Sequence, residues 1–164
     1  MLVRNKGFPL DFGQAYNKAA DYCALQERCI SDVNLKLKSW SVDKNYFGKI
    51  IRKLQEEGFL DEERFAQSYV GGKFRINGWG KLKIAASLRF KSVPQALIDN
   101  ALHSINEEDY LATLETLLYK KLKLLGGNTP ENRQKATYYA ASRGFELGLI
   151  SRIMGNGYWL LENG

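Results

Sequence analysis

Apolar residues recur every three or four positions along most of the chain, which is the spacing of amphipathic helices. The longest stripe comprises Leu111, Leu114, Leu118, Leu122 and Leu125. No window of the sequence shows the sustained alternation of apolar and polar residues that is typical of a half-buried β-strand. The pattern therefore predicts an all-α protein.

Residue types that begin or end helices flank these stripes. Ser31 precedes one stripe and is expected as the N-cap of that helix. Gly58 and the pair Gly126-Gly127 follow two other stripes, where a glycine commonly ends a helix. Pro94 is expected in the first turn of a helix, and a further helix should begin at residues 129–131. These signals predict short helices joined by tight turns.

The predicted helices group in threes. Short basic segments are followed by an apolar residue and a short helix at Val42, Val93 and Phe145, which are separated by 51 and 52 residues. The first helix of each group is expected to begin near Asp11, Asp61 and Glu107. A period of about fifty residues indicates tandem repeats that pack in a row. We predict an elongated array of three three-helix repeats, at residues 11–60, 61–105 and 106–155, with terminal segments at 1–10 and 156–164.

The composition fits a soluble protein of modest size. The chain has 164 residues, of which 45% are hydrophobic, enough for one compact domain or a short row of modules. Lys6, Pro9 and Asp11 interrupt any apolar stretch at the start, so no secretory signal is expected. Lysines break the longest apolar clusters well below membrane-spanning length. We expect a monomeric, cytoplasmic protein with no membrane partner.

Side chains that commonly carry catalysis are scarce. Cys23, Cys29 and His103 are the only cysteines and the only histidine, and their spacing assembles no zinc site. We expect both thiols to be reduced and partly buried. The consecutive carboxylates at 61–63 would point to different sides of a helix and not converge on a substrate. We therefore predict no metal, no cofactor and no enzymatic activity.

The positive charges are concentrated in one segment. The chain has a formal net charge of +6, which favours an anionic partner. Six basic residues and no acidic ones occur between Gly71 and Lys91; they are Lys73, Arg75, Lys81, Lys83, Arg89 and Lys91. We interpret them, with Arg143 further along, as a docking surface for phosphates or an acidic protein face. An ordinary solvated helix exterior is the alternative. Trp79 within this segment either anchors the next helix or lies exposed beside the cations, and the buried anchor is the favoured expectation.

Three stretches resemble the signatures of the RecX family. They are Leu60-Asp61-Glu62-Glu63-Arg64-Phe65-Ala66, Gly78-Trp79-Gly80 with Lys83-Ile84, and Ser142-Arg143-Gly144-Phe145. Arg28, Ser31, Leu37 and Trp40 resemble a first-repeat signature of some branches, and the similarity covers roughly residues 15–154. Lys91-Ser92-Val93 departs from the family, which often has glycine where Ser92 stands. Gly71-Gly72 also departs, because it puts two glycines into a predicted helix.

The resemblance implies a regulator and no enzyme. RecX proteins are tandem three-helix-repeat proteins that bind the RecA nucleoprotein filament and suppress its ATPase, strand-exchange and coprotease activities. The resemblance thus implies RecA and the RecA–DNA filament as partners, without a cofactor or metal. Scattered lysines predict weak DNA binding without sequence preference. The alternatives are a helix-turn-helix-like DNA-binding regulator that acts without RecA, and an enzyme with a site of dispersed carboxylates and tyrosines.

Overall fold

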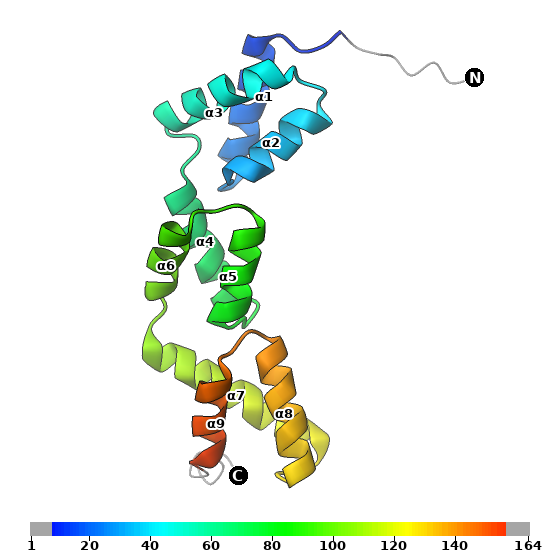
Figure 1. Ribbon diagram of the computed structural model, residues 1–164, viewed down its shortest axis with the longest axis vertical. Coiled ribbons are helices and arrows are strands. Elements are labelled where there is room, and N and C mark those ends of the chain that lie inside the picture. Colours follow the sequence, from blue (N-terminus) through cyan, green and yellow to red (C-terminus); the bar gives the residue numbers. More distant parts are fainter. Residues whose placement is uncertain (1–7, 157–164) are drawn as a thin grey trace, which may run out of the picture. The chain divides into compact units, whose positions relative to one another are not determined.

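The computed structural model describes residues 8–156, and all regular structure within them is helical (Figure 1). The elements in chain order are α1 (Phe12–Leu25), α2 (Ile30–Ser39), the short 3-10 helix η1 (Lys44–Tyr46), α3 (Phe47–Glu56), α4 (Glu62–Arg75), α5 (Lys81–Phe90), α6 (Gln95–His103), α7 (Glu107–Leu125), α8 (Pro130–Ser142) and α9 (Leu147–Gly155). This confirms the all-α prediction. Residues 1–7 and 157–164 of the predicted terminal segments lie outside the described residues.

The first helix of each group begins where the sequence predicts it, because a polar side chain satisfies a free backbone N–H there. Asp11 accepts from Gln14 N at 2.8 Å before α1. Asp61 accepts from Arg64 N at 3.0 Å at the start of α4, and Asn106 accepts from Asp109 N at 3.0 Å before α7. The predicted starts near Asp11, Asp61 and Glu107 are therefore confirmed.

Other predicted helix ends are confirmed or shifted by a residue or two. Gly58 follows α3 with a φ of 78°, and Gly126 caps α7 with a φ of 95°, the left-handed conformation that glycine adopts easily. Pro94 precedes the first turn of α6 as its N-cap instead of lying in that turn. The prediction for Ser31 is wrong, because α2 begins two residues earlier, with Cys29 as its N-cap.

A side chain from a later helix explains why no serine is needed at the start of α2. Ile30 N donates to the carboxylate of Glu62 at 3.1 Å, and Cys29 N donates to Asp32 Oδ2 at 3.4 Å. The Ser31 Oγ lies 3.2 Å from the Cys29 Sγ, so it binds a side chain and not the helix end. Both cysteines are free thiols in the core, as expected.

The chain forms two compact units, each with its own core. One comprises Met1–Phe65 with Lys91–Val93, and the other comprises Ala66–Phe90 with Pro94–Gly164. The first unit packs α1, α2 and α3 around buried residues that include Tyr16, Leu37 and Ile50. In the second, Tyr110 of α7 and Phe145 before α9 are the largest fully buried side chains. The repeat boundaries at 11–60, 61–105 and 106–155, and the elongated shape, stay predictions.

A left-handed backbone conformation recurs at the spacing of about fifty residues found in the sequence. Ser41, Ser92 and Gly144 have φ values of 56°, 60° and 95°, and each stands one residue before the apolar residue of its repeat, Val42, Val93 or Phe145. All three therefore adopt the left-handed conformation, which costs a residue with a side chain about 1–2 kcal/mol. Ser92 thus holds a left-handed conformation that glycine would adopt without this cost. The other departure, Gly71-Gly72, does not interrupt α4.

Candidate interaction site

Two of the three sequence signatures meet in the second unit, although 64 residues separate Gly80 from Gly144. A Cβ on Gly80 would lie 2.3 Å from the carbonyl carbon and oxygen of Gly144, and a Cβ on Gly144 would lie 2.3 Å from Lys83 Cβ. Neither position has room for a side chain. The two glycines are therefore required because the turn before α5 crosses the turn before α9 at backbone contact.

This crossing also satisfies the first turn of α5. Gly80 N donates to Arg143 O at 2.8 Å, and Leu82 N donates to Gly144 O at 3.0 Å. Lys81 N, between them, donates to the Tyr110 hydroxyl at 3.0 Å. Three successive N–H groups of a helix end, which normally need a cap or water, are thus bound by residues of the following repeat.

Tyr110 is the centre of the crossing. It is 1% exposed, and its ring lies 5.8 Å from that of Phe74 and 5.1 Å from that of Phe145. Its hydroxyl donates to Glu146 Oε2 at 2.6 Å while it accepts from Lys81 N. Burial, and then the adjacent Glu146 carboxylate, raise the pKa of Tyr110. The phenol therefore stays protonated and available as a donor.

The remaining signature, 60–66, belongs to the first unit except for its last residue, Ala66, which belongs to the second. Leu60, Phe65 and Ala66 are buried. Arg64 forms an ion pair with Glu27 at 2.5 Å and donates to Gly58 O at 3.1 Å. These contacts hold the start of α4 against the end of α3 and the turn before α2.

Three of the predicted docking residues are engaged within the chain. Lys81 Nζ lies 2.5 Å from Glu107 Oε1, and Lys91 Nζ lies 2.9 Å from Asp32 Oδ1. The Arg143 guanidinium donates to the backbone carbonyl of Asn77. The structure thus places Lys81, Lys91 and Arg143 where they stabilise turns and helix starts.

The side chain of Trp79 is half-buried, so the favoured prediction of a buried anchor is wrong. It lies beside the cations, with Lys73 Nζ 4.6 Å and Lys83 Nζ 4.5 Å from its ring centroid. Cations at these distances are attracted to the indole face. The two ammonium groups thus lie over the ring, and part of the side chain remains open to solvent.

Arg75 and Arg89 are the predicted docking residues that point to solvent. Both are exposed, and within residues 8–156 neither has an ion-pair partner. Each is followed by an exposed apolar side chain: Ile76 is 85% exposed and Phe90 is 92% exposed. Both arginines lie in the last turn of a helix, where their charge also favours the helix macrodipole.

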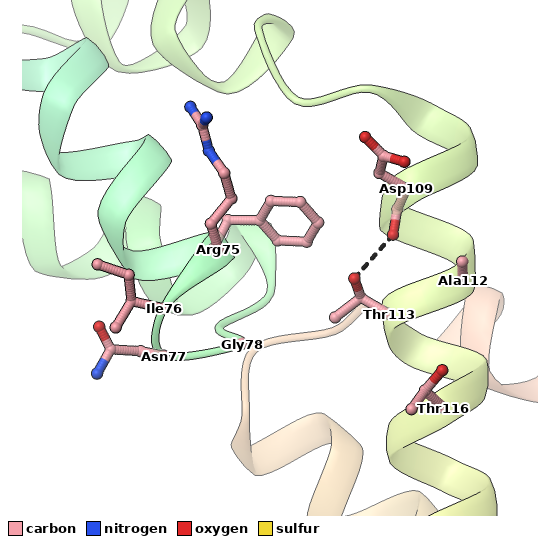
Figure 2. A pocket seen from close by; sticks show the side chains of 9 residues that line it. Arg75, Ile76, Asn77, Gly78, Asp109, Ala112, Thr113 and Thr116 are labelled. Atoms are coloured by element: carbon pink, nitrogen blue, oxygen red, sulfur yellow. Dashed lines mark hydrogen bonds between the residues drawn. The ribbon is translucent and has the colours of Figure 1, made fainter.

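A cavity of about 580 Å³ adjoins the first of these arginines (Figure 2). It lies between the end of α4 and one face of α7, and all of its lining belongs to the second unit. The lining residues are Phe74, Arg75, Ile76, Asn77, Gly78, Asp109, Ala112, Thr113 and Thr116. Small side chains on α7 leave the space open, while Arg75, Asn77 and Asp109 provide charge and hydrogen-bonding groups at its border.

One cluster of the first unit was not predicted. Tyr22 and Trp40 lie together with Lys18, Arg28 and Lys36 around them. The sequence separates these residues by up to 22 positions, and only Arg28 and Trp40 carried a signal there, as part of the resemblance. Helical spacing of Lys18 with Tyr22, and of Lys36 with Trp40, could have pointed to it.

Across residues 8–156, no group of cysteine, histidine and carboxylate side chains is arranged to hold a metal ion. In the same part of the chain no helix is long and apolar enough to cross a membrane. The fold and the crossing turns define an all-helical protein of tandem three-helix domains.

Comparison with known proteins agrees with this class. The family model for the second three-helix domain of RecX matches residues 61–102, and the family model for the third matches residues 107–154. Together the two matches cover more than half of the chain. The chain belongs to the RecX family.

Relatives and solved structures extend the match beyond these domains. The chain is 27% identical over 144 residues to the regulatory protein RecX of Prosthecochloris aestuarii, covering 88% of this chain and 93% of that protein. It is 28% identical to the regulatory protein RecX of Bacillus subtilis over 86% of its own length but only 54% of the relative's. The crystal structure of RecX from Lactobacillus salivarius superposes with a TM-score of 0.80 at 23% identity, over 88% of this chain and 95% of that one.

Proposed function

We propose that this chain binds the RecA–DNA filament and inhibits the recombinase without catalysing a reaction itself. Membership of the RecX family supports this proposal, since relatives are named regulatory proteins. RecA as the partner comes from what the family resemblance implies. The proposal places the protein in the cytoplasm with RecA, as a monomer that needs no cofactor.

The observation that carries the proposed contact is the pairing of free arginines with exposed apolar side chains. Arg75 adjoins Ile76 and Arg89 adjoins Phe90, and all four side chains are exposed. Arginine and aromatic residues are enriched at the centres of protein interfaces, where they supply most of the binding energy. An acidic protein face with apolar pockets would complement such pairs.

The cavity beside Arg75 supports the same surface. Its volume of about 580 Å³ exceeds what a single side chain fills, so a loop of the partner could enter it. Lys73 and Lys83, which lie on Trp79, would add positive charge to the surface without being fixed in ion pairs. We leave Lys81, Lys91 and Arg143 out of the contact, because their charges serve bonds within the chain.

The test is titration of the protein into preformed RecA filaments on single-stranded DNA, with DNA-dependent ATPase activity and strand exchange as readouts. Both activities should fall. The variant Arg75→Glu/Arg89→Glu should lose inhibition, because each reversal removes an attraction and adds a repulsion. The control is Lys120→Glu/Lys123→Glu, which makes the same change of charge at exposed positions on α7.

Circular dichroism should show that both variants remain helical. An inactive wild type at several-fold excess over a cognate RecA would refute the proposed function. Equal inhibition by the arginine variant and its control would place the contact elsewhere on the chain. Selection of one short duplex sequence from a random pool, held at high salt, would support the helix-turn-helix alternative instead.

A further inference from the structure

The first unit carries an aromatic and basic cluster that the proposed RecA contact does not use. The rings of Tyr22, on α1, and Trp40, after α2, meet edge to face, with centroids 6.2 Å apart and an interplanar angle of 83°. Both side chains are partly exposed. Two aromatic rings thus reach the surface side by side.

Three cations surround these rings. Lys18 Nζ lies 4.6 Å from the Trp40 centroid, and Arg28 Cζ lies 3.9 Å from the Tyr22 centroid. Lys36 Nζ lies 5.4 Å from the ring centroid of Tyr22 and 5.8 Å from that of Trp40. Cation–π attraction holds each of them near a ring.

The three cations of this cluster have no ion-pair partner within the described part of the chain. Arg28 Nε donates to the carbonyl oxygen of Tyr22 at 3.4 Å, which leaves the charge of the guanidinium without a counter-charge. Two acidic residues of the same unit are committed elsewhere: Asp32 to Lys91 at 2.9 Å and Glu27 to Arg64 at 2.5 Å. Like charges gathered without counter-charges repel one another, and an anionic ligand would remove that cost.

We infer that this cluster is a binding site for single-stranded nucleic acid. Phosphates would meet the three cations, and a base would stack on an aromatic ring, the combination that binds single strands without sequence preference. A base that takes a lysine's place on a ring frees that ammonium to reach the adjacent phosphate. A duplex hides its base faces, so it would use the cations but not the rings.

The inference does not depend on RecA, so it is tested with the purified full-length chain and DNA alone. The probe is a fluorescein-labelled oligo(dT) of 20 nucleotides, measured by polarisation in a salt series, with a duplex of equal length for comparison. Binding should be tighter to the single strand, and it should weaken with rising salt. Tighter binding to the duplex would overturn the inference.

Charge-reversal variants locate the contact. Lys18→Glu/Lys36→Glu should weaken binding to oligo(dT) about tenfold or more, because two phosphate contacts become repulsive. The control is Lys49→Glu/Arg52→Glu, which makes the same change of charge at exposed positions of α3 in the same unit. This control variant should weaken binding only about twofold, because it lowers the overall positive charge of the protein without touching the cluster. Equal losses in the two variants would show attraction to net charge alone and would overturn the site.

Trp40 reports stacking directly and does not require its own replacement. The chain has three tryptophans, so Trp79→Phe/Trp159→Phe leaves Trp40 as the only one. Saturating unlabelled oligo(dT) should quench its emission, because a stacked base lies on the indole. Unchanged Trp40 emission while polarisation reports binding would overturn the inference. Because RecA is absent throughout, neither result depends on whether the RecA proposal holds.

Discussion

Replacing Gly144 by alanine should destabilise the second unit more than a glycine with the same backbone conformation elsewhere. The added Cβ would lie 2.3 Å from Lys83 Cβ, 2.6 Å from Lys83 N and 3.0 Å from Gly80 O. Two of these are backbone atoms, one of them in α5, which cannot turn away as a flexible side chain would. Gly126 provides the control, because it has the same φ of 95° but no neighbour within 4 Å of an added Cβ.

The two substitutions share one cost and differ in another. An alanine in the left-handed conformation costs about 1–2 kcal/mol at either position. Overpacking at Gly144 adds about 1–3 kcal/mol, so Gly144→Ala should lose about 2–5 kcal/mol in total. The difference between the two variants isolates the backbone crossing.

Thermal unfolding followed by circular dichroism measures this difference. For a chain of this size 1 kcal/mol corresponds to about 2–4 °C, so the Tm of Gly144→Ala should lie about 2–12 °C below that of Gly126→Ala. Hydrogen exchange should show faster exchange of the Gly80 and Leu82 amides in the Gly144 variant alone, since their acceptors are displaced. Equal Tm values and unchanged protection of both amides would refute the packing argument.

Three further predictions concern other contacts. Tyr110→Phe removes the donor to Glu146 and should cost about 1–3 kcal/mol in urea unfolding, because the half-buried Glu146 carboxylate loses its donor and Lys81 N loses its acceptor; a loss below about 0.5 kcal/mol would contradict the network. Ser92→Gly should raise the stability by about 0.5–1 kcal/mol, since relief of the left-handed conformation exceeds the entropy cost of glycine, and a lower Tm would contradict this. Burial alone would raise the pKa of Asp32, but hydrogen bonds from Lys91 and Cys29 outweigh it and lower the pKa below its ordinary 3.8. Its contribution is therefore present above about pH 4 and is lost as the pH falls further, so Asp32→Asn should destabilise the chain at pH 7 and have little effect near pH 2.

Helices and their ends could be predicted because their causes are local. The leucine stripe of α7 and the glycine at 126 depend on neighbours three or four positions away, and the sequence displays them directly. The start of α2 was misplaced because its N–H groups bind Glu62, a residue 32 positions after Ile30 that no local pattern connects to it.

The candidate site was predicted in composition but not in arrangement. A run of six cations shows where charge is abundant. It does not show that Lys81 forms an ion pair with Glu107 and Lys91 an ion pair with Asp32. The signature glycines pointed to a tight turn, but the partner of that turn lies 64 residues later. Such pairings depend on tertiary packing, which one sequence does not specify by spacing alone.

The crossing of the two turns has a consequence for synthesis of the protein on the ribosome. The acceptors for the Gly80 and Leu82 amides are the carbonyls of Arg143 and Gly144. A nascent chain therefore contains all of α5 more than fifty residues before the acceptors for its first turn have been translated. Until then water must accept the hydrogen bonds of these two N–H groups, and the ring of Tyr110 lacks its contact with Phe145. The second repeat thus matures only when most of the third has left the exit tunnel, and a chain stopped before residue 143 would expose this end of α5 to chaperones and proteases.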